Sequence, residues 1–547
     1  MTQASGRQLH RITPTRRQLL TGGAALAAVG VAAASATAAA TTPLVAPLGT
    51  PVAALPADLS SAAGSVDRGT IQRWARDTWA SLVAMTDSRT GLPADNISGP
   101  LAAPKRSGYT SPTNIGGYLW STVVARELGI IGAAECRQRL TATLTTLSRL
   151  KKHVPSGMFY NWYDEATGAV VSVWPEDGTM IHPFLSSVDN GWFAAALMVV
   201  RTAEPRVAAL ADRLLRPMNF AVFYDKAARP GVAAGLLRGG FYDVKPVVET
   251  VQGNYLGTGP DVFYTLNHYD IHVSEPRIAS YIGIARGQIP PAHYYATQRV
   301  FPDSCDWSWL EQKPVGRHRT YYGIDVFEGA FTYRGMHIVP SWGGDMFEAL
   351  MPDLFVPEAA WAPSSWGINH RLTVRAQREF GLLDAKYGYW GFSPASRPGG
   401  GYTAWGVDAI GMDPAGYASD MEGTNADAGF AGCRTGTAPN PTWGDGVVTP
   451  HASFLALQYE PVQAFENLVR IERTLGAYGE GGFYDAVAVR SGLIANRYLS
   501  LDQAMVLGAI GNVFGDDVIR RNFVRGEIQA KIKPLIEIEQ FGAGVIA

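Results

Sequence analysis

The sequence predicts one mainly helical domain with long loops, and three observations support this prediction. Apolar residues recur at intervals of three and four over many separate stretches, which is typical of amphipathic helices. Segments rich in glycine, proline and aromatic residues lie between these stretches. No proline- and serine-rich break follows residue 66, and a chain of 547 residues with 47% hydrophobic character can bury a large core. We therefore expect one domain over residues 67–547.

The individual elements follow from the same periodicity. In the first half of the chain it predicts helices over 67–86, 113–131, 133–153, 186–203 and 204–220. Residues 157–175, "GMFYNWYDEATGAVVSVWP", alternate and turn like a β-hairpin. Further helices are predicted over 274–287, 449–476 and 500–515. No exact repeat is detectable, but helices at such regular spacing are typical of paired-helix architectures.

The N-terminus resembles an export signal. The segment "TRRQLL" (residues 15–20) is followed by an Ala-rich apolar run that ends in Ala-Ala-Ala at Ala40. Twin arginines before a weakly hydrophobic run are typical of a Tat signal, whereas a segment made mostly of Ala and Gly is a poor membrane anchor. We expect residues 1–40 to be a Tat signal peptide, residues 41–66 to be a flexible linker, and the mature protein to be extracytoplasmic.

Composition excludes several classes of partner. The net charge is −2 and no run of Lys or Arg occurs outside the N-terminus, so no nucleic acid is expected. No later apolar stretch is long enough to span a membrane. The three cysteines, Cys136, Cys305 and Cys433, are too scattered for a disulfide framework, although one long-range disulfide is compatible with them. The ten histidines contain no H-E-x-x-H pair, so we expect no metal site. We also expect no cofactor and a monomeric protein.

Carboxylates embedded among aromatic residues are the main chemical signal. Phosphate-binding loops and a G-x-S-x-G motif are absent from the sequence. Aromatic residues make up 11% of the chain, and their flat faces suit sugar rings as well as protein cores. Carboxylic acids in such surroundings are typical of glycoside hydrolysis. The candidates are Asp164, Asp189, Glu249, Asp270, Glu275, Glu328, Asp345, Glu348 and Asp502.

Eight blocks resemble a known family, in order, over roughly residues 70–516. They are "SPTNIGGYL", "GMFYNWYD", "SSVDNGW", "HYDIHVSEPRIASYIGIARGQIPPAHYYATQR", "SWGGDMFEALMP", "YGYWGFS", "VVTPHASFLAL" and "YLSLDQAM". The family is that of the putative glucoamylases, with bacterial endo-β-1,2-glucanases and the transglycosylation domain of cyclic β-1,2-glucan synthases. The resemblance implies an (α/α)6 barrel, a toroid with long loops and short β-hairpins around a cleft. It also implies action on a glucan-like polysaccharide or oligosaccharide.

Glu275 is the first candidate for catalysis. Ser274 before an apolar-periodic run predicts an N-cap, and Pro276 suits the first helical turn. Glu275 would then begin a helix, where the macrodipole alone favours an acidic residue. The resemblance implies a different role, because the glutamate in this block of the family is the catalytic acid.

An acid at a helix N-terminus meets a conflict. The helix dipole lowers the pKa of a carboxyl, whereas a proton donor near neutral pH needs a raised pKa. Burial or nearby groups must therefore outweigh the dipole. Asp270, together with His268, Tyr269 and His272, could supply those surroundings.

The second carboxylate departs from the family pattern. Relatives carry an acidic residue shortly after G-[IFL]-[ST], whereas this chain has Ser396 and Arg397 there. Three explanations are open. The role has moved along the loop to Asp408, our first choice, or to Asp413 or Asp420; it is taken by Asp189 or Glu348; or the protein binds sugar without hydrolysing it.

Further residues are candidate sugar contacts, each with a structural alternative. Asp189 could simply start its helix, Asp164 could close a turn, and Glu348 could form a buried ion pair. Most tryptophans of a helical barrel lie in the core. Trp162 and Trp192 are further candidates for contact with a sugar ring, together with the tryptophans of the set below. The predicted substrate-binding set is Asp164, Asp189, Tyr269, Asp270, Trp342, Glu348, Trp390 and Trp405.

The sequence therefore favours an exported glycoside hydrolase that uses carboxylate acid/base catalysis on a glucan, with β-1,2-glucan as one candidate. Two alternatives stay open. One is a sugar-binding relative that has lost the second carboxylate. The other is a polysaccharide lyase, in which Tyr269 and His268 would carry the β-elimination.

Overall fold

A computed structural model describes residues 66–300, 312–412 and 443–546. The predicted signal peptide and nearly all of the predicted linker lie outside these ranges, as do Asp413, Asp420, Cys305 and Cys433. Cys136 is buried with a free thiol.

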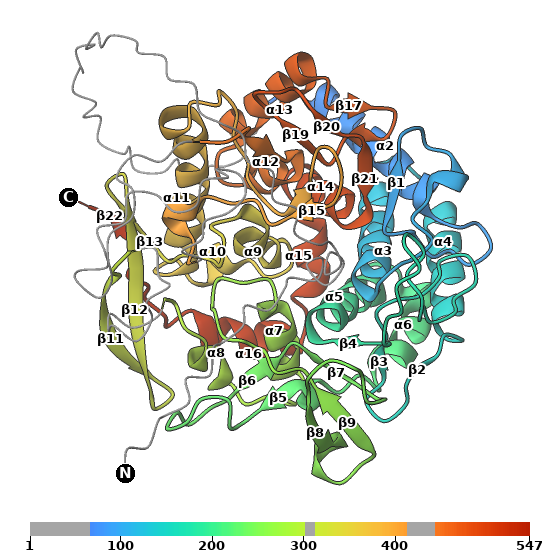
Figure 1. The fold of residues 1–547 in the computed structure, drawn as a ribbon, viewed down its shortest axis with the longest axis vertical. Coiled ribbons are helices and arrows are strands. Elements are labelled where there is room, and N and C mark those ends of the chain that lie inside the picture. Colours follow the sequence, from blue (N-terminus) through green and yellow to red (C-terminus); the bar gives the residue numbers. More distant parts are fainter. Residues whose placement is uncertain (1–65, 301–311, 413–442, 547) are drawn as a thin grey trace, which may run out of the picture.

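Six helices form an inner ring, seen end-on in Figure 1. Along the ring, α3 packs on α5, α5 on α7, α9 on α12, α12 on α14, and α14 on α3. The Arg277 side chain closes the gap between α7 and α9 by donating to the backbone carbonyls of Glu348 and Ala349. The inner helices are α3 (Pro112–Glu127), α5 (Ser187–Ala203), α7 (Arg277–Ala285), α9 (Met346–Leu350), α12 (Pro450–Ala456) and α14 (Ser500–Phe514).

A second layer of helices covers this ring, one against each inner helix. The pairs are α2 (Arg68–Met85) on α14, α4 (Ala133–Leu147) on α3, α6 (Ala208–Leu215) on α5, α16 (Glu527–Ile536) on α7, α11 (Trp366–Glu379) on α9, and α13 (Pro461–Leu475) on α12. Six inner and six outer helices make an (α/α)6 barrel, which confirms the predicted fold class. The short helix α15 (Val518–Phe523) contacts α3, α5 and α14 and lies near the middle of the ring (Figure 1).

The sequence of each helix fits its layer. In the inner helix α5 every residue from Ser187 to Val200 is buried, because its neighbours surround it on all sides. The outer helix α13 instead buries one stripe, with Ala464, Leu468 and Ile471 at helical spacing.

Three predicted helix boundaries need correction. The stretch 449–476 forms two helices, since α12 ends at Ala456 and α13 begins at Pro461, whose ring cannot continue a helix from the preceding turn. Helix α4 ends at Leu147, and residues 152–153 belong to a strand. Helix α7 begins at Arg277 with Pro276 as its N-cap residue, so Ser274 is not the cap and Glu275 lies in the turn before the helix.

Short β-sheets occupy the loops between the helices. The predicted hairpin within 157–175 is present as a pairing of Tyr163 with Val170. A four-stranded sheet, β11 (Val315–Tyr321), β12 (Ile324–Tyr333), β13 (Met336–Ile338) and β22 (Gly544–Val545), lies at the left of Figure 1, and a second, β4 (Leu185–Ser186), β7 (Gly240–Tyr242), β9 (Asp261–Tyr264) and β8 (Val251–Asn254), projects at the bottom.

The remaining short elements complete the described chain. They are β1 (Asn96–Ser98) with β21 (Arg497–Leu499), β2 (Lys152–His153) with β3 (Met158–Phe159), β5 (Tyr224–Asp225) and β10 (His268–Tyr269) on either side of β6 (Leu236–Arg238), β14 (Ala395–Ser396) with β15 (Tyr402–Thr403), β16 (Val447–Val448) and β20 (Ile494–Ala495) on either side of β19 (Ala486–Ala488), β17 (Tyr478–Gly479) with β18 (Gly482–Phe483), and the helices α8 (His293–Ala296) and α10 (Glu358–Trp361). Among the described residues, no helix has both the length and the apolar character that a membrane crossing requires.

A buried charge network ties the C-terminal segment to the outer sheet. Arg299 is fully buried and pairs with Glu539, while the Glu328 carboxylate on β12 lies 3.6 Å from the Arg299 Nε atom. Burial raises the pKa of Glu328 to about 8, because Arg299 opposes the shift only in part and the nearby Glu539 charge adds to it. Glu328 therefore stays protonated in the folded protein over a pH range in which it ionises in the unfolded chain.

This difference predicts a pH-dependent stability. A carboxyl whose folded pKa is raised contributes stability that is complete below its ordinary pKa of about 4.5 and is lost as pH rises towards 8. Glu328→Gln should remove that loss. The thermal unfolding midpoint of the variant should therefore rise relative to that of wild type as pH increases from 5 to 8. The exposed Glu176→Gln is the control. Parallel unfolding curves for Glu328→Gln and wild type would contradict the assignment.

Candidate active site

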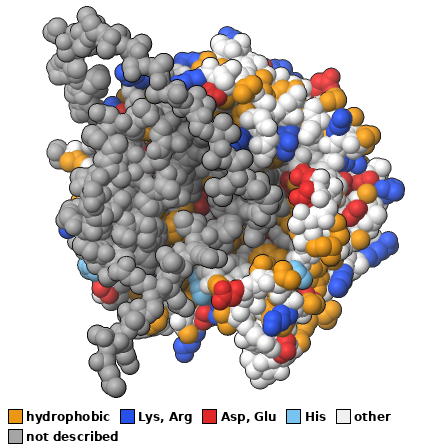
Figure 2. Space-filling view, viewed as in Figure 1, with side chains coloured by type: hydrophobic (Ala, Val, Ile, Leu, Met, Phe, Trp, Pro, Cys, Tyr) orange, Lys and Arg blue, Asp and Glu red, His pale blue; other side chains and the backbone are white. Residues whose placement is uncertain are grey.

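The N-terminal ends of the inner helices meet at one end of the ring. Thr113 of α3 donates to the Asp189 carboxylate of α5 at 2.6 Å, and Trp192 of α5 donates to the Glu275 carboxylate before α7 at 2.9 Å. His451 of α12 lies 3.7 Å from the Asp502 carboxylate of α14. Six helix N-termini thus surround one region, and their dipoles favour negative charge there. Figure 2 shows one face of the ring, hollowed near its middle, with acidic side chains at the rim of the hollow.

Glu275 is buried, with 6% of its surface exposed. Its Oε2 atom accepts the indole N–H of Trp192, which fixes the carboxylate against α5. Helix α7 does not hold it by a cap, because Glu275 precedes the first helical residue by two positions. Its position comes instead from the turn and from the neighbouring helix.

Tyr269 lies among three of the predicted carboxylates. Burial raises the pKa of Tyr269 far above its ordinary value, and the charges of Glu275, Asp189 and Glu348 raise it further. Charges raise the pKa of a hydroxyl group in this way only when they lie near it, so the three carboxylates lie near the Tyr269 hydroxyl. The structure therefore brings together four residues that were predicted for the site and that come from three separate parts of the sequence.

Glu348 and Asp345 form a proton-sharing pair beside Glu275. The backbone N–H of Glu348 donates to Asp345 Oδ1 at 2.8 Å, and Glu348 Oε2 accepts the backbone N–H of Trp342 at 3.0 Å. Burial, then the charge of Asp345 and that of Glu275, raises the pKa of Glu348 well above its ordinary value. Burial also raises the pKa of Asp345 to about 6. The raised pKa favours the protonated form of Glu348, and no cation is among the causes of its shift.

Asp408, the first choice for the second carboxylate, lies in an adjacent chain segment. Val273 pairs with Ser341, and Ser341 pairs with Gly411, so the segments around Glu275, Trp342 and Asp408 run side by side. Asp408 is buried, and its Oδ1 atom accepts the backbone N–H of Ala409 at 3.1 Å at the start of a short 3-10 helix, Asp408–Ile410. Asp408 stays a candidate for the second carboxylate, although one of its two carboxylate oxygens already accepts a hydrogen bond from the backbone of the next residue.

Asp485 is a carboxylate that sequence reasoning missed. It is buried just before β19, and its Oδ2 atom accepts the backbone N–H of Ser396 at 2.6 Å. The resemblance predicts an acidic residue at the position of Ser396, and Asp485 brings a carboxylate to that place from another loop. The signal was present in "GGFYDAV", where an acid follows aromatic residues as it does in "FYNWYD".

Other predicted contacts divide between the turn, the core and the site. The Asp164 carboxylate accepts the backbone N–H groups of Ala166 and Thr167, which confirms its structural alternative as a turn residue. Trp390 is buried in the main core. Asp270 is half-buried, and burial raises its pKa to about 6 against the opposing charge of Arg229. Trp405 is buried in a separate cluster of small residues.

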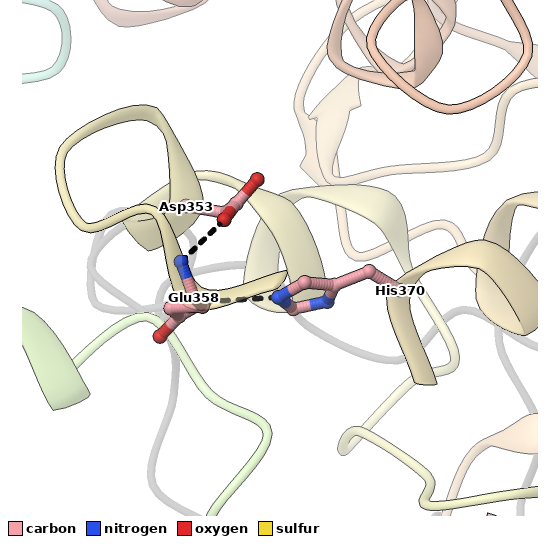
Figure 3. Close-up of side chains that lie close together, drawn as sticks. All are labelled: Asp353, Glu358 and His370. Carbon is pink, nitrogen blue, oxygen red and sulfur yellow. Dashed lines mark hydrogen bonds and ion pairs between the residues drawn. The ribbon is translucent and has the colours of Figure 1, made fainter. Parts of the chain in front are cut away.

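Two buried groups of His and carboxylates have spacing that could hold a metal. In the first, Asp353 accepts the backbone N–H of Glu358 at 2.9 Å, and Glu358 contacts His370 at 3.0 Å (Figure 3). Arg277 pairs with Glu358 and Arg520 pairs with Asp353, so this cluster already has its cations. The Arg277 charge overcomes burial and lowers the pKa of Glu358 to about 2. The second group is His451, Asp485 and Asp502, with donor atoms within 4.8 Å of one another.

Arg277 holds the turn that carries Glu275 against α9. Its Nε and one terminal nitrogen donate to the Glu358 carboxylate at 2.7 and 2.9 Å. The remaining N–H groups donate to the backbone carbonyls of Ser274, Glu348 and Ala349 at 2.7 to 2.9 Å. All five guanidinium donors are therefore used. Because Ser274 precedes Glu275, this residue fixes the distance between Glu275 and Glu348.

We expect Arg277→Lys to lower kcat by at least about 10-fold in the folded fraction, because an ammonium group cannot reproduce the planar fork. KM should change less than kcat, since the substitution would misplace Glu275, the predicted proton donor. Circular dichroism would establish the folded fraction at each temperature. The matched control is Arg375→Lys on the surface of α11, where Arg375 forms an ion pair with Glu379 one helical turn away. An unchanged kcat in folded Arg277→Lys would remove the positioning role.

A ring of paired helices with buried carboxylates gathered at one end of its inner layer places the chain among (α/α)6 barrels with a carboxylate-rich site. Comparison with known proteins agrees. Residues 317–526 match a family model described as putative glucoamylase, and residues 73–270 match a model of a protein of unknown function, DUF3131. The resemblance predicted from the sequence blocks is thereby confirmed.

The chain is similar to individual proteins over most of its length. It is 24% identical to the cyclic β-(1,2)-glucan synthase NdvB of Rhizobium meliloti over 83% of this chain, but it spans only 18% of that protein. A crystal structure of a putative glucoamylase from Bacteroides caccae superposes with a TM-score of 0.58 at 16% identity, covering 88% of this chain and 100% of that one. The endo-β-1,2-glucanase of Chitinophaga pinensis, in complex with sophorotriose and glucose, gives 0.58 at 16% identity, with 86% and 99% covered.

Proposed function

We propose that the protein is an exported glycoside hydrolase that cleaves a glucan, with β-1,2-glucan as the first substrate to test. The observation that carries this proposal is the buried Glu275, held by the Trp192 indole at the end of the ring where Asp189, Tyr269 and Glu348 converge. Endo-β-1,2-glucanases and a β-1,2-glucan synthase among the similar proteins support the choice of substrate.

In the proposed reaction Glu275 donates a proton to the glycosidic oxygen as the bond to the anomeric carbon breaks. A second carboxylate either removes a proton from the attacking water or attacks the anomeric carbon itself. Asp485 and Asp408 are the candidates for this role. Burial and the neighbouring carboxylates raise the pKa of Glu348, and its protonated form would limit the negative charge beside Glu275.

The structure argues against the lyase alternative. β-Elimination would require Tyr269 to lose its proton, but burial and the three surrounding carboxylates raise the pKa of this phenol. His268, the suggested partner, contacts the Asp225 carboxylate at 2.9 Å, and Asp225 also pairs with Arg238. Both groups are thus poorly suited to act as a base.

The test is to incubate the purified protein with β-1,2-, β-1,3-, β-1,4- and α-linked glucans and with arabinans, and to separate the products by chromatography. We expect new reducing ends from a glucan and no product that absorbs in the ultraviolet. An unsaturated uronate product would show a lyase. Binding of a glucan without products would favour the sugar-binding alternative.

Export by the Tat route is a separate part of the proposal. We expect Arg16→Lys with Arg17→Lys to leave the precursor in the cytoplasm, because the signal is recognised through its arginine pair. Cell fractionation and immunoblotting would measure this, with Arg11→Lys as the control outside the pair. Undiminished export of the double variant would overturn the Tat assignment.

A further inference from the structure

A cavity of about 150 Å³ opens beside the β14–β15 hairpin and the β16–β19–β20 sheet. Its lining includes Arg397, Trp405, Asp445, Val447, Ala488 and Leu493. The proposed chemistry of Glu275 makes no use of this cavity.

Small side chains create the space. Trp405 packs in a cluster whose other buried members are four alanines, among them Ala488, and Val447. Alanine side chains leave room that larger ones would fill. A cavity of about 150 Å³ is the size that holds a single six-membered ring such as benzene.

The chemistry of the lining suits a sugar ring. Trp405 is 3% exposed, and its indole N–H has no hydrogen-bond acceptor among the residues that the structure describes. A buried indole N–H usually has a partner, so a missing acceptor points to one supplied by a ligand. Arg397 places an exposed guanidinium at the opening, where its Nε donates to Thr403 Oγ1 at 3.2 Å. An aromatic wall with a few polar groups is typical of small-ligand pockets.

The cavity adjoins the second carboxylate. Arg397 follows Ser396, whose backbone N–H donates to Asp485. Asp485 in turn precedes the strand β19 that carries Ala488, and Trp405 lies three residues before Asp408. The cavity is therefore lined by chain segments that continue directly into both candidates for the base, Asp485 before β19 and Asp408 in the short 3-10 helix after Trp405.

We propose that this cavity is a subsite that binds one pyranose ring of the saccharide, with Trp405 donating to a ring or hydroxyl oxygen and Arg397 contacting hydroxyl groups at the opening. The identity of the saccharide as a glucan rests on the proposed function. The existence of a ring-binding pocket rests on the cavity and its lining alone.

The test measures saccharide affinity in full-length protein carrying Glu275→Gln, which prevents turnover. Ala488→Leu fills the cavity, and Trp405→Phe removes the indole N–H while it keeps an aromatic ring. We expect Trp405→Phe to weaken binding of β-1,2-linked glucooligosaccharides by about 3- to 10-fold in calorimetric titrations, as for one lost hydrogen bond. Ala488→Leu should weaken binding at least as much, because the larger side chain takes the space of the ring. Ala530→Leu on the exposed face of α16 and Trp361→Phe on α10 are the matched controls.

Affinities within twofold of the parent for both folded variants would overturn the subsite. If Ala488→Leu does not fold, Trp405→Phe and Arg397→Ala decide the matter. When no saccharide of the panel, glucan or arabinan, binds the parent, the subsite is also wrong. The proposed function fails separately, when wild type binds a saccharide but releases no reducing ends. In that case weaker binding in the variants would still establish the pocket.

Discussion

Glu275→Gln is expected to lower kcat by at least about 100-fold, because general acid catalysis typically contributes 10² to 10⁴ to the rate. The glutamine amide keeps the size of the side chain, and its oxygen can still accept the Trp192 N–H that holds Glu275 in wild type. Fold and sugar binding should therefore survive. The expected phenotype is binding without turnover, measured as an unchanged dissociation constant with a reduced kcat.

A matched control distinguishes a catalytic role of Glu275 from the stabilisation that a glutamate gives near a helix N-terminus. Glu527 is an exposed glutamate in the first turn of α16, where the helix dipole favours an acidic residue. Glu527→Gln should leave kcat unchanged. The alkaline limb of the kcat–pH profile should also disappear in Glu275→Gln, since that limb reports loss of the donor's proton. A near wild-type kcat for Glu275→Gln would return this residue to a structural role in the turn.

The long inner helices could be predicted from periodicity, whereas α11 could not. Helix α11 buries Asn369, His370 and Gln377, which makes its inward face look polar in the sequence. These side chains are satisfied by distant groups: Asn369 contacts the Val339 backbone, and Gln377 donates to the carbonyls of Gly344 and Phe392. Apolar periodicity cannot reveal a buried face that is stabilised by hydrogen bonds across the fold.

The candidate site was predictable in part for a similar reason. Glu275, Asp189, Tyr269 and Glu348 each lie in a block that resembles the family, and the structure brings them together. Asp485 was missed because its relation to Ser396 spans 89 residues and runs through a backbone N–H, which leaves no pattern in the sequence. The N-cap predicted at Ser274 was wrong because the helix begins only at Arg277, with Pro276 at the N-cap position and no side-chain cap.

The second large effect is expected for Asp485→Asn. If Asp485 replaces the acidic residue that relatives carry near Ser396, this change should lower kcat by at least about 100-fold while binding is retained. Asparagine still offers an oxygen to the Ser396 N–H, so a purely structural role would leave kcat nearly unchanged. The acidic limb of the pH profile should also be lost, since that limb reports protonation of the base. Azide, a small anion, should restore part of the rate if the missing carboxylate was the base or nucleophile.

Asp408→Asn is the decisive comparison, because Asp408 is the other candidate for the second carboxylate. We expect a loss of less than about 10-fold, since one oxygen of Asp408 already serves the Ala409 N–H at the start of its own helix. A large loss there with little effect at Asp485 would restore the relocation predicted from the sequence. Loss at neither position would leave Asp413, Asp420, Asp189 and Glu348 as the residues to substitute next, and the base is the one whose amide variant is inactive. A sugar-binding relative would instead show no turnover in the wild-type protein.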